Sequence, residues 1–269
     1  FAHSLSADNS SRNTSFIKDL KDWSRIAKHI FIWDYAENWR GFMTPYPNIN
    51  ALGSNIQTFM KYKVMGVFEG GQNLSYGSDF EELKSWLIGK LLWNPYQNTE
   101  FLARQFIKDY YGSSSQEILQ YYNLYNSLVK PDVHIGCRLK NESEFYNDDF
   151  VKKAYPIMER AEKAASDSVI LERVKKVKLQ VLASEYALHP QNFYRSGKWL
   201  EFKTLVLKYN AYIKLGVGPE KFIPEFESVV KKKKWHIKES SIKPLALLIS
   251  IGVLIATGVG LKRRIRKTV

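Results

Sequence analysis

The sequence contains little cysteine and none of the short motifs that mark common catalytic and nucleotide-binding sites. Cys137 is the only cysteine among 269 residues, which excludes an internal disulfide framework and a cysteine-based metal cluster. Neither Gly-x-Gly-x-x-Gly nor Gly-x-x-x-x-Gly-Lys-Ser/Thr occurs, and His-Glu-x-x-His and Gly-x-Ser-x-Gly are also missing. We therefore predict no cofactor and no metal site.

The sequence also lacks an initiator methionine, since residue 1 is Phe, and no signal peptide precedes it. We expect it to be the later part of a longer polypeptide or a processed product, with upstream residues missing. Its length suits one large domain or two modest ones. It is too short for a complete (β/α)8 barrel of about 250 residues together with a helical half.

Positive charge is unevenly distributed along the chain. The formal net charge is +13, but residues 221–269 hold 12 Lys and Arg against three Glu, which leaves only +4 for the first 220 residues. No basic helix with interleaved aromatic residues occurs in those 220 residues. The basic excess is thus a property of the tail, and the pattern argues against nucleic-acid binding.

The first regular pattern is a strand, a helix and a second strand. Apolar runs at residues 29–35 and 64–71 end in Asp34 and Glu69, and residues 50–62 between them have helical spacing. Strands joined by one crossover helix run parallel, so both acids are predicted at the same rim of the sheet. Such rims carry the chemistry of α/β folds, and we predict Asp34 and Glu69 as catalytic residues. Alternatively, Asp34 caps a local turn and Glu69 is an ordinary loop acid.

Aromatic and amide side chains lie close to these acids in the sequence. Flat rings suit the C–H faces of a sugar, and charged or amide groups suit its hydroxyls. Aromatic residues also fill cores, and Trp33 fits this alternative too. His3 belongs to the rim if residues 1–5 end a strand, and otherwise to a frayed terminus. The predicted substrate-binding residues are Trp33, Tyr35, Trp39, Tyr46, Asn48 and His3.

Helical spacing predicts two helices in the first part of the chain, at residues 16–28 after Ser15 and at 80–93 after Asp79, each with the preceding residue as its cap. Beyond residue 95 the pattern is helical, with helices predicted at 98–111, 115–130, 148–167, 168–188 and 197–215, and near the end it becomes apolar. Residues 244–261 carry no charge and as a helix would span roughly 27 Å, with Lys243 and Lys262 at its ends. We predict a transmembrane helix here, and a buried core helix is the alternative. The basic cluster directly after it favours a cytoplasmic tail, which would place the globular part outside the cytoplasm, at the cell surface.

Several runs in the first half resemble the "domain of unknown function 4838" family, which occurs mostly in bacterial, often secreted, carbohydrate-active proteins. The similarity covers about residues 1–130. It is carried by Ile32-Trp33-Asp34-Tyr35, Pro45-Tyr46-Pro47-Asn48, Gly66-Val67-Phe68-Glu69-Gly70, Leu91-Leu92-Trp93-Asn94-Pro95 and Tyr110-Tyr111-Gly112.

The resemblance implies an α/β part followed by an all-α part. The α/β part would be the closing portion of a TIM-type barrel, related to α-glucuronidases and hexosaminidases. The missing upstream chain would supply the earlier strands and the catalytic acid, and Asp34 and Glu69 would act as bases on the water side. The expected domains are a partial barrel (1–95), a helical module (96–215), a basic linker (216–243), the membrane span (244–261) and a basic tail (262–269).

The leading functional interpretation is therefore a membrane-anchored fragment of a glycoside hydrolase that binds carbohydrate. The fragment alone is expected to be inactive. One alternative is a surface protein that binds glycan without cleaving it. Another is a scaffold whose helical half recruits protein partners.

Overall fold

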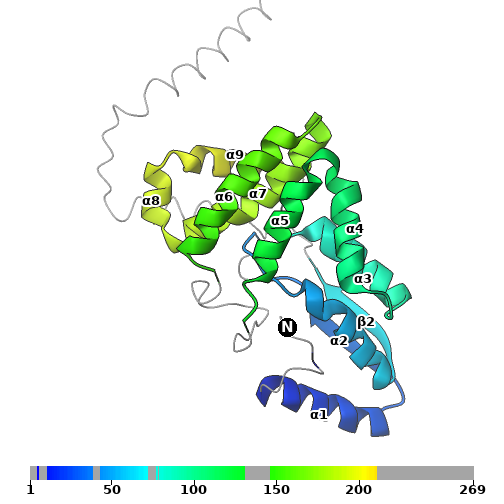
Figure 1. Cartoon of the computed structure of the whole chain (residues 1–269). Helices are drawn as coiled ribbons and strands as arrows, with labels where there is room; N and C mark the ends of the chain where they lie inside the picture. Colours follow the sequence, from blue (N-terminus) through cyan, green and yellow to red (C-terminus); the bar gives the residue numbers. More distant parts are fainter. Residues whose placement is uncertain are drawn as a thin grey trace, which may run out of the picture. The chain divides into compact units, whose positions relative to one another are not determined.

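The computed structural model describes residues 5, 11–38, 43–71, 77, 79–130 and 146–210, all within the first of the chain's two units, Phe1–Glu220. Helix α1 comes first, a β-α-β unit follows it, and a run of helices comes last (Figure 1). The strands are β1 (Ile30–Tyr35) and β2 (Val64–Gly70). The helices are α1 (Ser11–Ile26), α2 (Ile49–Lys61), α3 (Glu81–Trp93), α4 (Thr99–Tyr111), the 3-10 helix η1 (Gly112–Ser114), α5 (Ser115–Asn126), α6 (Asp148–Ala164), α7 (Ser168–Leu188), α8 (Pro190–Arg195) and α9 (Lys198–Asn210).

β1 and β2 form a two-stranded parallel sheet with unlike faces. Ile32 pairs with Val67, and both pack against a small core of Leu5, Leu20 and Phe59. Residues on the opposite face are exposed, because side chains alternate along each strand. This exposed face carries Phe31, Trp33 and Phe68.

Two glycines of β2 make room for the aromatic rings of β1. A Cβ on Gly66 would come within 2.9 Å of the Phe31 ring, and one on Gly70 within 3.2 Å of the Tyr35 ring. Contacts this short would force the ring or the backbone to shift. The glycines therefore let the β1 rings lie across the neighbouring strand.

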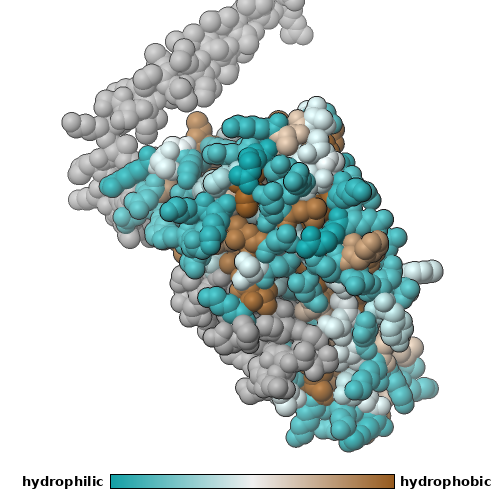
Figure 2. Space-filling view, viewed as in Figure 1, coloured by the Kyte–Doolittle hydropathy of each residue, from teal (hydrophilic) through white to brown (hydrophobic). Residues whose placement is uncertain are grey.

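The crossover helix α2 joins the sheet to the helical part. Phe59 faces the small core under the sheet, whereas Ile49, Leu52 and Ile56 belong to the large core shared by α3, α4, α5, α6 and α7. On the face shown in Figure 2, hydrophilic residues cover much of the described surface. Burial of the apolar side chains that these helices turn toward the core, rather than helix propensity, supplies most of their stability.

The prediction of a TIM-type barrel portion is wrong. The described residues contain one two-stranded sheet and are otherwise mostly helical, so they form no barrel. The sequence contains one β-α-β pattern, and a single pattern of this kind specifies two strands rather than a closed ring. The fold class of the described residues is instead mostly helical, with one small parallel sheet.

The prediction of a membrane-anchored protein at the cell surface also has to be corrected. No helix in the described part of the chain is long and apolar enough to cross a membrane. The longest of these helices, α7, has 21 residues but includes Lys175, Lys176 and Lys178. The segment predicted as a span, 244–261, lies outside the described residues, as do the linker 216–243 and the tail 262–269.

Helix α6 begins with a side-chain cap that can be tested. The Asn147 side chain accepts a hydrogen bond from the backbone N–H of Phe150 at 3.0 Å. Asn147→Ala is expected to lower the free energy of unfolding by about 1 kcal/mol, because one N–H of the first turn loses its partner. Asn147→Asp keeps the acceptor and should retain the stability in urea denaturation. Equal stability of the Ala and Asp variants would contradict this role for Asn147.

Candidate functional site

The structure places Asp34 directly opposite Glu69 at the carboxyl ends of β1 and β2. Strand alternation puts both side chains on the face that carries Ile32 and Val67, which the small core covers. Directly paired residues on neighbouring parallel strands lie about 4.8 Å apart along the hydrogen-bonding direction. The two carboxyl groups are therefore close enough to influence each other's ionisation.

Burial makes this pair hold protons more tightly than free carboxyl groups do. Burial, followed by the neighbouring Asp34, raises the pKa of Glu69 to about 8. Burial also raises the pKa of Asp34, although the Tyr35 N–H, which donates to Oδ1 of Asp34 at 2.8 Å, lowers it. The Glu69 Oε2 atom is enclosed, and none of the described residues forms a hydrogen bond with it. Glu69 is thus protonated at neutral pH, and the pair can store and release a proton.

The aromatic residues predicted to surround these acids divide between two places. Trp33 is 66% exposed and packs against Phe68 with ring centroids 4.7 Å apart. It lies on the sheet face opposite the carboxyl groups, as does Tyr35, whose ring centroid is 6.5 Å from that of Trp33. Trp39 and His3 lie outside the described residues.

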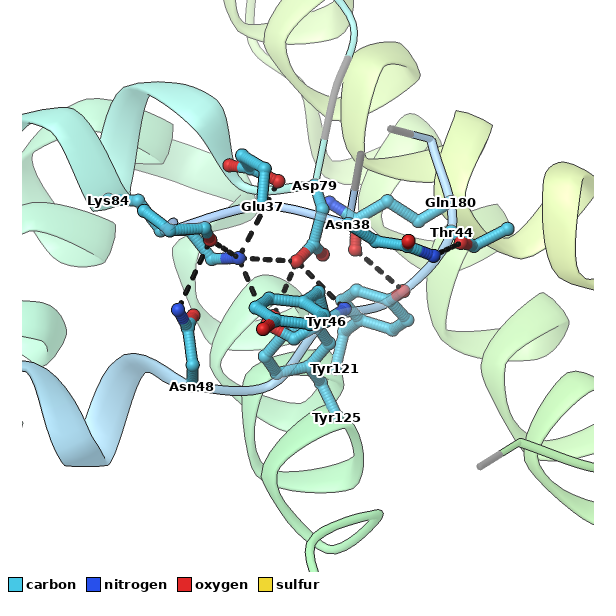
Figure 3. Close-up of polar contacts among 11 residues, drawn as sticks. Glu37, Asn38, Thr44, Tyr46, Asn48, Asp79, Lys84, Tyr121, Tyr125 and Gln180 are labelled. Carbon is cyan, nitrogen blue, oxygen red and sulfur yellow. Dashed lines mark hydrogen bonds and ion pairs between the residues drawn. The ribbon is translucent and has the colours of Figure 1, made fainter. Parts of the chain in front are cut away.

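Tyr46 and Asn48, also predicted to bind substrate, lie inside a buried polar network (Figure 3). Tyr46 is only 1% exposed, and its backbone N–H donates to Oδ2 of Asp79 at 2.9 Å. The Asn48 side chain donates to the carbonyl of Ala36 at 3.2 Å. In this structure both residues hold the loop after β1 in place and present almost no surface to a ligand.

Lys84 is the centre of this network. Its ammonium group donates to the carbonyl oxygens of Ala36 at 3.1 Å and Tyr46 at 3.0 Å, and to Oδ2 of Asp79 at 2.6 Å. All three hydrogens of the group therefore have acceptors, although the side chain is almost fully buried. Lys84 thereby fixes the loop after β1 to the first turn of α3.

Asp79 extends the network to the later helices. Its Oδ2 also accepts from the hydroxyl of Tyr125 on α5 at 2.6 Å. Gln180 on α7 joins it when its amide is oriented to satisfy both ends: Nε2 donates to Oδ1 of Asp79 at 3.2 Å, and Oε1 accepts from Phe80 N at 2.9 Å. One carboxylate thus connects the loop, α3, α5 and α7.

Glu37 is a second enclosed acid of the network. Its Oε2 lies 3.7 Å from Nζ of Lys84 but has no hydrogen-bond partner. Burial raises the pKa of Glu37 well above its usual range, and this outweighs the opposing effect of Lys84, while Asp79 adds to the rise. Lys84 therefore bonds directly to Asp79, and burial favours the protonated form of Glu37.

Sequence patterns alone do not bring Glu37, Asp79 and Lys84 into one cluster. Asp79 was interpreted as a helix cap only. A signal for Lys84 does exist, since it lies at helical spacing from Phe80 and Leu87 on the apolar stripe of α3. A lysine in such a stripe indicates a buried partner, because an unpaired buried charge is strongly unfavourable.

Comparison with known protein families finds a match in the N-terminal part of the chain. Residues 1–123 match the family described as domain of unknown function (DUF4838). This is the family that the sequence motifs resemble. No curated protein and no solved structure matches the chain. The matched residues include the strand-end pair Asp34 and Glu69 as well as Glu37, Asp79 and Lys84 of the network.

The network predicts a large effect on stability when its cation is removed. Lys84→Met should lower the free energy of unfolding by about 3–5 kcal/mol, because Asp79 is then buried without its counter-charge. Lys90→Met on the same helix is the control, and it should change stability by less than about 0.5 kcal/mol because Lys90 is exposed. Urea denaturation monitored by circular dichroism measures both. A loss below about 1 kcal/mol for Lys84→Met would contradict the role assigned to it.

The strand-end pair predicts a pH-dependent difference between the wild type and Glu69→Gln. The pKa of Glu69 rises from an ordinary value of 4.5 to about 8, so folding takes up a proton between these pH values. The stability of the wild type should therefore fall relative to Glu69→Gln from pH 4.5 to about 8, and the difference should level off above that. Urea denaturation across this range measures it, with Glu159→Gln on the exposed side of α6 as control. A pH-independent difference would refute the shift.

Proposed function

We propose that the chain acts on carbohydrate through glycoside-hydrolase chemistry at the strand-end pair. The observation that carries the proposal is the protonated Glu69 opposite Asp34 on adjacent strands. Glycosidases use two carboxyl groups near the scissile bond, one of which must hold a proton at the working pH. A glutamic acid with a pKa of about 8 meets that requirement.

The raised pKa favours a division of labour within the pair. Glu69 would donate its proton to the glycosidic oxygen as the bond to the anomeric carbon breaks. Asp34, which receives an N–H bond from Tyr35, would be the carboxylate that stabilises positive charge on the ring or activates water. This departs from the expectation that both residues act as bases, because a group protonated at neutral pH is better suited to the acid role.

A second candidate is binding of glycan without cleavage. It is favoured by the exposed rings of Phe31, Trp33 and Phe68, which lie on the open face of the sheet. Such rings stack on sugar C–H groups without any acid–base chemistry. The two candidates differ in which face of the sheet contacts the sugar.

Hydrolysis of aryl glycosides and binding to a glycan panel by the full chain test the proposal. Glu69→Gln and Asp34→Asn should each lower kcat by about 100-fold or more, because general acid–base catalysis contributes 10²–10⁴-fold. The activity of the wild type should fall as the pH rises through about 8, where Glu69 loses its proton. Glu159→Gln is the control and should retain full activity.

Two outcomes would contradict the catalytic role. The first is hydrolysis that is unchanged in Glu69→Gln. The second is the absence of hydrolysis for every glycoside on the panel. If the chain binds glycan without hydrolysis and Trp33→Ala abolishes the binding, the second candidate is supported instead.

A further inference from the structure

A cavity of about 390 Å³ lies at the turn between α3 and α4, away from the strand ends. Trp86 and Lys90 come from α3, and Phe101 and Gln105 come from α4. Gln97 and Asn98 of the connecting turn complete its polar lining. The two helices are neighbours in the fold, so their facing side chains form the walls (Figure 1). The volume falls in the range of about 300–1,000 Å³ that is typical of small-molecule sites.

Two aromatic rings and Leu102 provide the apolar part of the cavity. The Trp86 ring is fixed by packing against Phe106, with centroids 5.4 Å apart. Phe101 is 66% exposed although it is a large apolar side chain. Apolar rings that remain exposed beside a cavity offer flat surface for a ligand, and a ring already fixed by its neighbour loses little entropy on binding.

The turn between the helices holds its amide groups in fixed positions. Nε2 of Gln97 donates to the carbonyl oxygens of Lys90 at 3.0 Å and Asn94 at 3.2 Å, which leaves its Oε1 as an acceptor. Oδ1 of Asn98 accepts from Phe101 N at 2.8 Å as the cap of α4, which leaves its Nδ2 as a donor. The cavity therefore has an oriented acceptor and an oriented donor next to each other.

The only charged group among the lining residues is a cation. Nζ of Lys90 lies 5.4 Å from the centroid of the Trp86 ring, and no ion pair joins it to another of the described residues. No acidic side chain belongs to the lining. Lys90 is thus a third donor at the cavity, and it favours a ligand that is rich in oxygen acceptors.

We propose that this cavity binds a pyranose unit of a glycan. A sugar ring presents a C–H face that stacks on an aromatic ring, and its hydroxyls both donate and accept hydrogen bonds. Carboxamides are complementary to hydroxyls because they also do both. The site contains neither Asp34 nor Glu69, so it is a second carbohydrate site that does not depend on the proposed catalytic role.

Isothermal titration calorimetry with the full chain tests this site. The probes are cellotriose, maltotriose, chitotriose and trigalacturonic acid, so that neutral, acetamido and acidic sugars are compared. At least one should bind with a Kd of about 1 mM or tighter. Phe101→Ala should weaken binding of that sugar in the Asp34→Asn/Glu69→Gln background as well as in the wild type, which separates this site from the strand ends.

Matched variants identify the lining residues as the binding site. Phe101→Ala should weaken binding by about tenfold, because it removes a stacking ring. Asn98→Asp keeps the acceptor that caps α4 but removes the donor, and should weaken binding by about threefold or more. Tyr96→Ala is the control, because Tyr96 is 77% exposed on the same turn but does not line the cavity. It should leave the Kd unchanged.

Three outcomes would overturn the proposal. The first is that none of the four trisaccharides binds. The second is that one of them binds with the same Kd in Phe101→Ala as in the wild type. The third is that a proline-rich peptide binds this cavity in place of every sugar, since aromatic-lined grooves also take such peptides. Circular dichroism of each variant establishes that it is folded, so a loss of binding reports on the site.

Discussion

The structure depends on one buried ion pair, Lys84 with Asp79. Removing two charges from water is costly, and the cost is offset only when the remaining hydrogen-bonding capacity is satisfied. Here the ammonium group has three acceptors, and Oδ2 of Asp79 has three donors, from Lys84, Tyr46 and Tyr125. Because every one of these hydrogen bonds is formed, the pair holds the loop and the helices in one specific arrangement. Any displacement of the loop or of a helix leaves a buried charge without its partners.

The Lys84–Asp79 pair also determines the position of the strand ends. Ala36 follows β1 directly, and its carbonyl oxygen accepts from Lys84 and Asn48, while its N–H donates to the carbonyl of Gly70 at 3.1 Å. Ala36, two residues after Asp34, is therefore bonded to the network, and Gly70, directly after Glu69, is linked to it through Ala36. The register that places the two acids opposite each other is supported from the helical part of the chain. In this way a structural ion pair preorganises the candidate site without contacting it.

Local signals in the sequence predicted much of the secondary structure. The helix predicted at 168–188 has the bounds of α7, since Asp167 supplies two side-chain cap bonds. The helix predicted at 98–111 corresponds to α4, with Asn98 as its cap and Gly112 at its end. By contrast, α1 begins at Ser11 rather than after Ser15, because its first turn is polar and gives no apolar periodicity. The short helix α8 was missed for the same reason.

Features that depend on contacts between distant residues were not predictable in this way. The barrel was inferred from resemblance and was wrong, whereas the two strands were predicted from the apolar runs themselves. Tyr46 and Asn48 were predicted to face a ligand because they follow a strand with acids. Tyr46 instead bonds to Asp79, 33 residues away, and Asn48 bonds to the Ala36 carbonyl of its own loop. Sequence proximity cannot distinguish a side chain that lines a site from one that supports it.

Strand geometry explains why Trp33 lies on the sheet face opposite the two carboxyl groups. Trp33 precedes Asp34 on β1, and neighbouring residues of a strand point to opposite faces, so the ring and the carboxyl group cannot share one face. Adjacency in the sequence suggested that Trp33 and Asp34 share one sugar site. On a strand the same adjacency places the two side chains on opposite faces and argues against a shared site. On helices the spacing works differently, because residues four apart lie on the same face. Trp86 and Lys90 have this spacing, as do Phe101 and Gln105, so each helix brings a ring and a polar group to the same cavity.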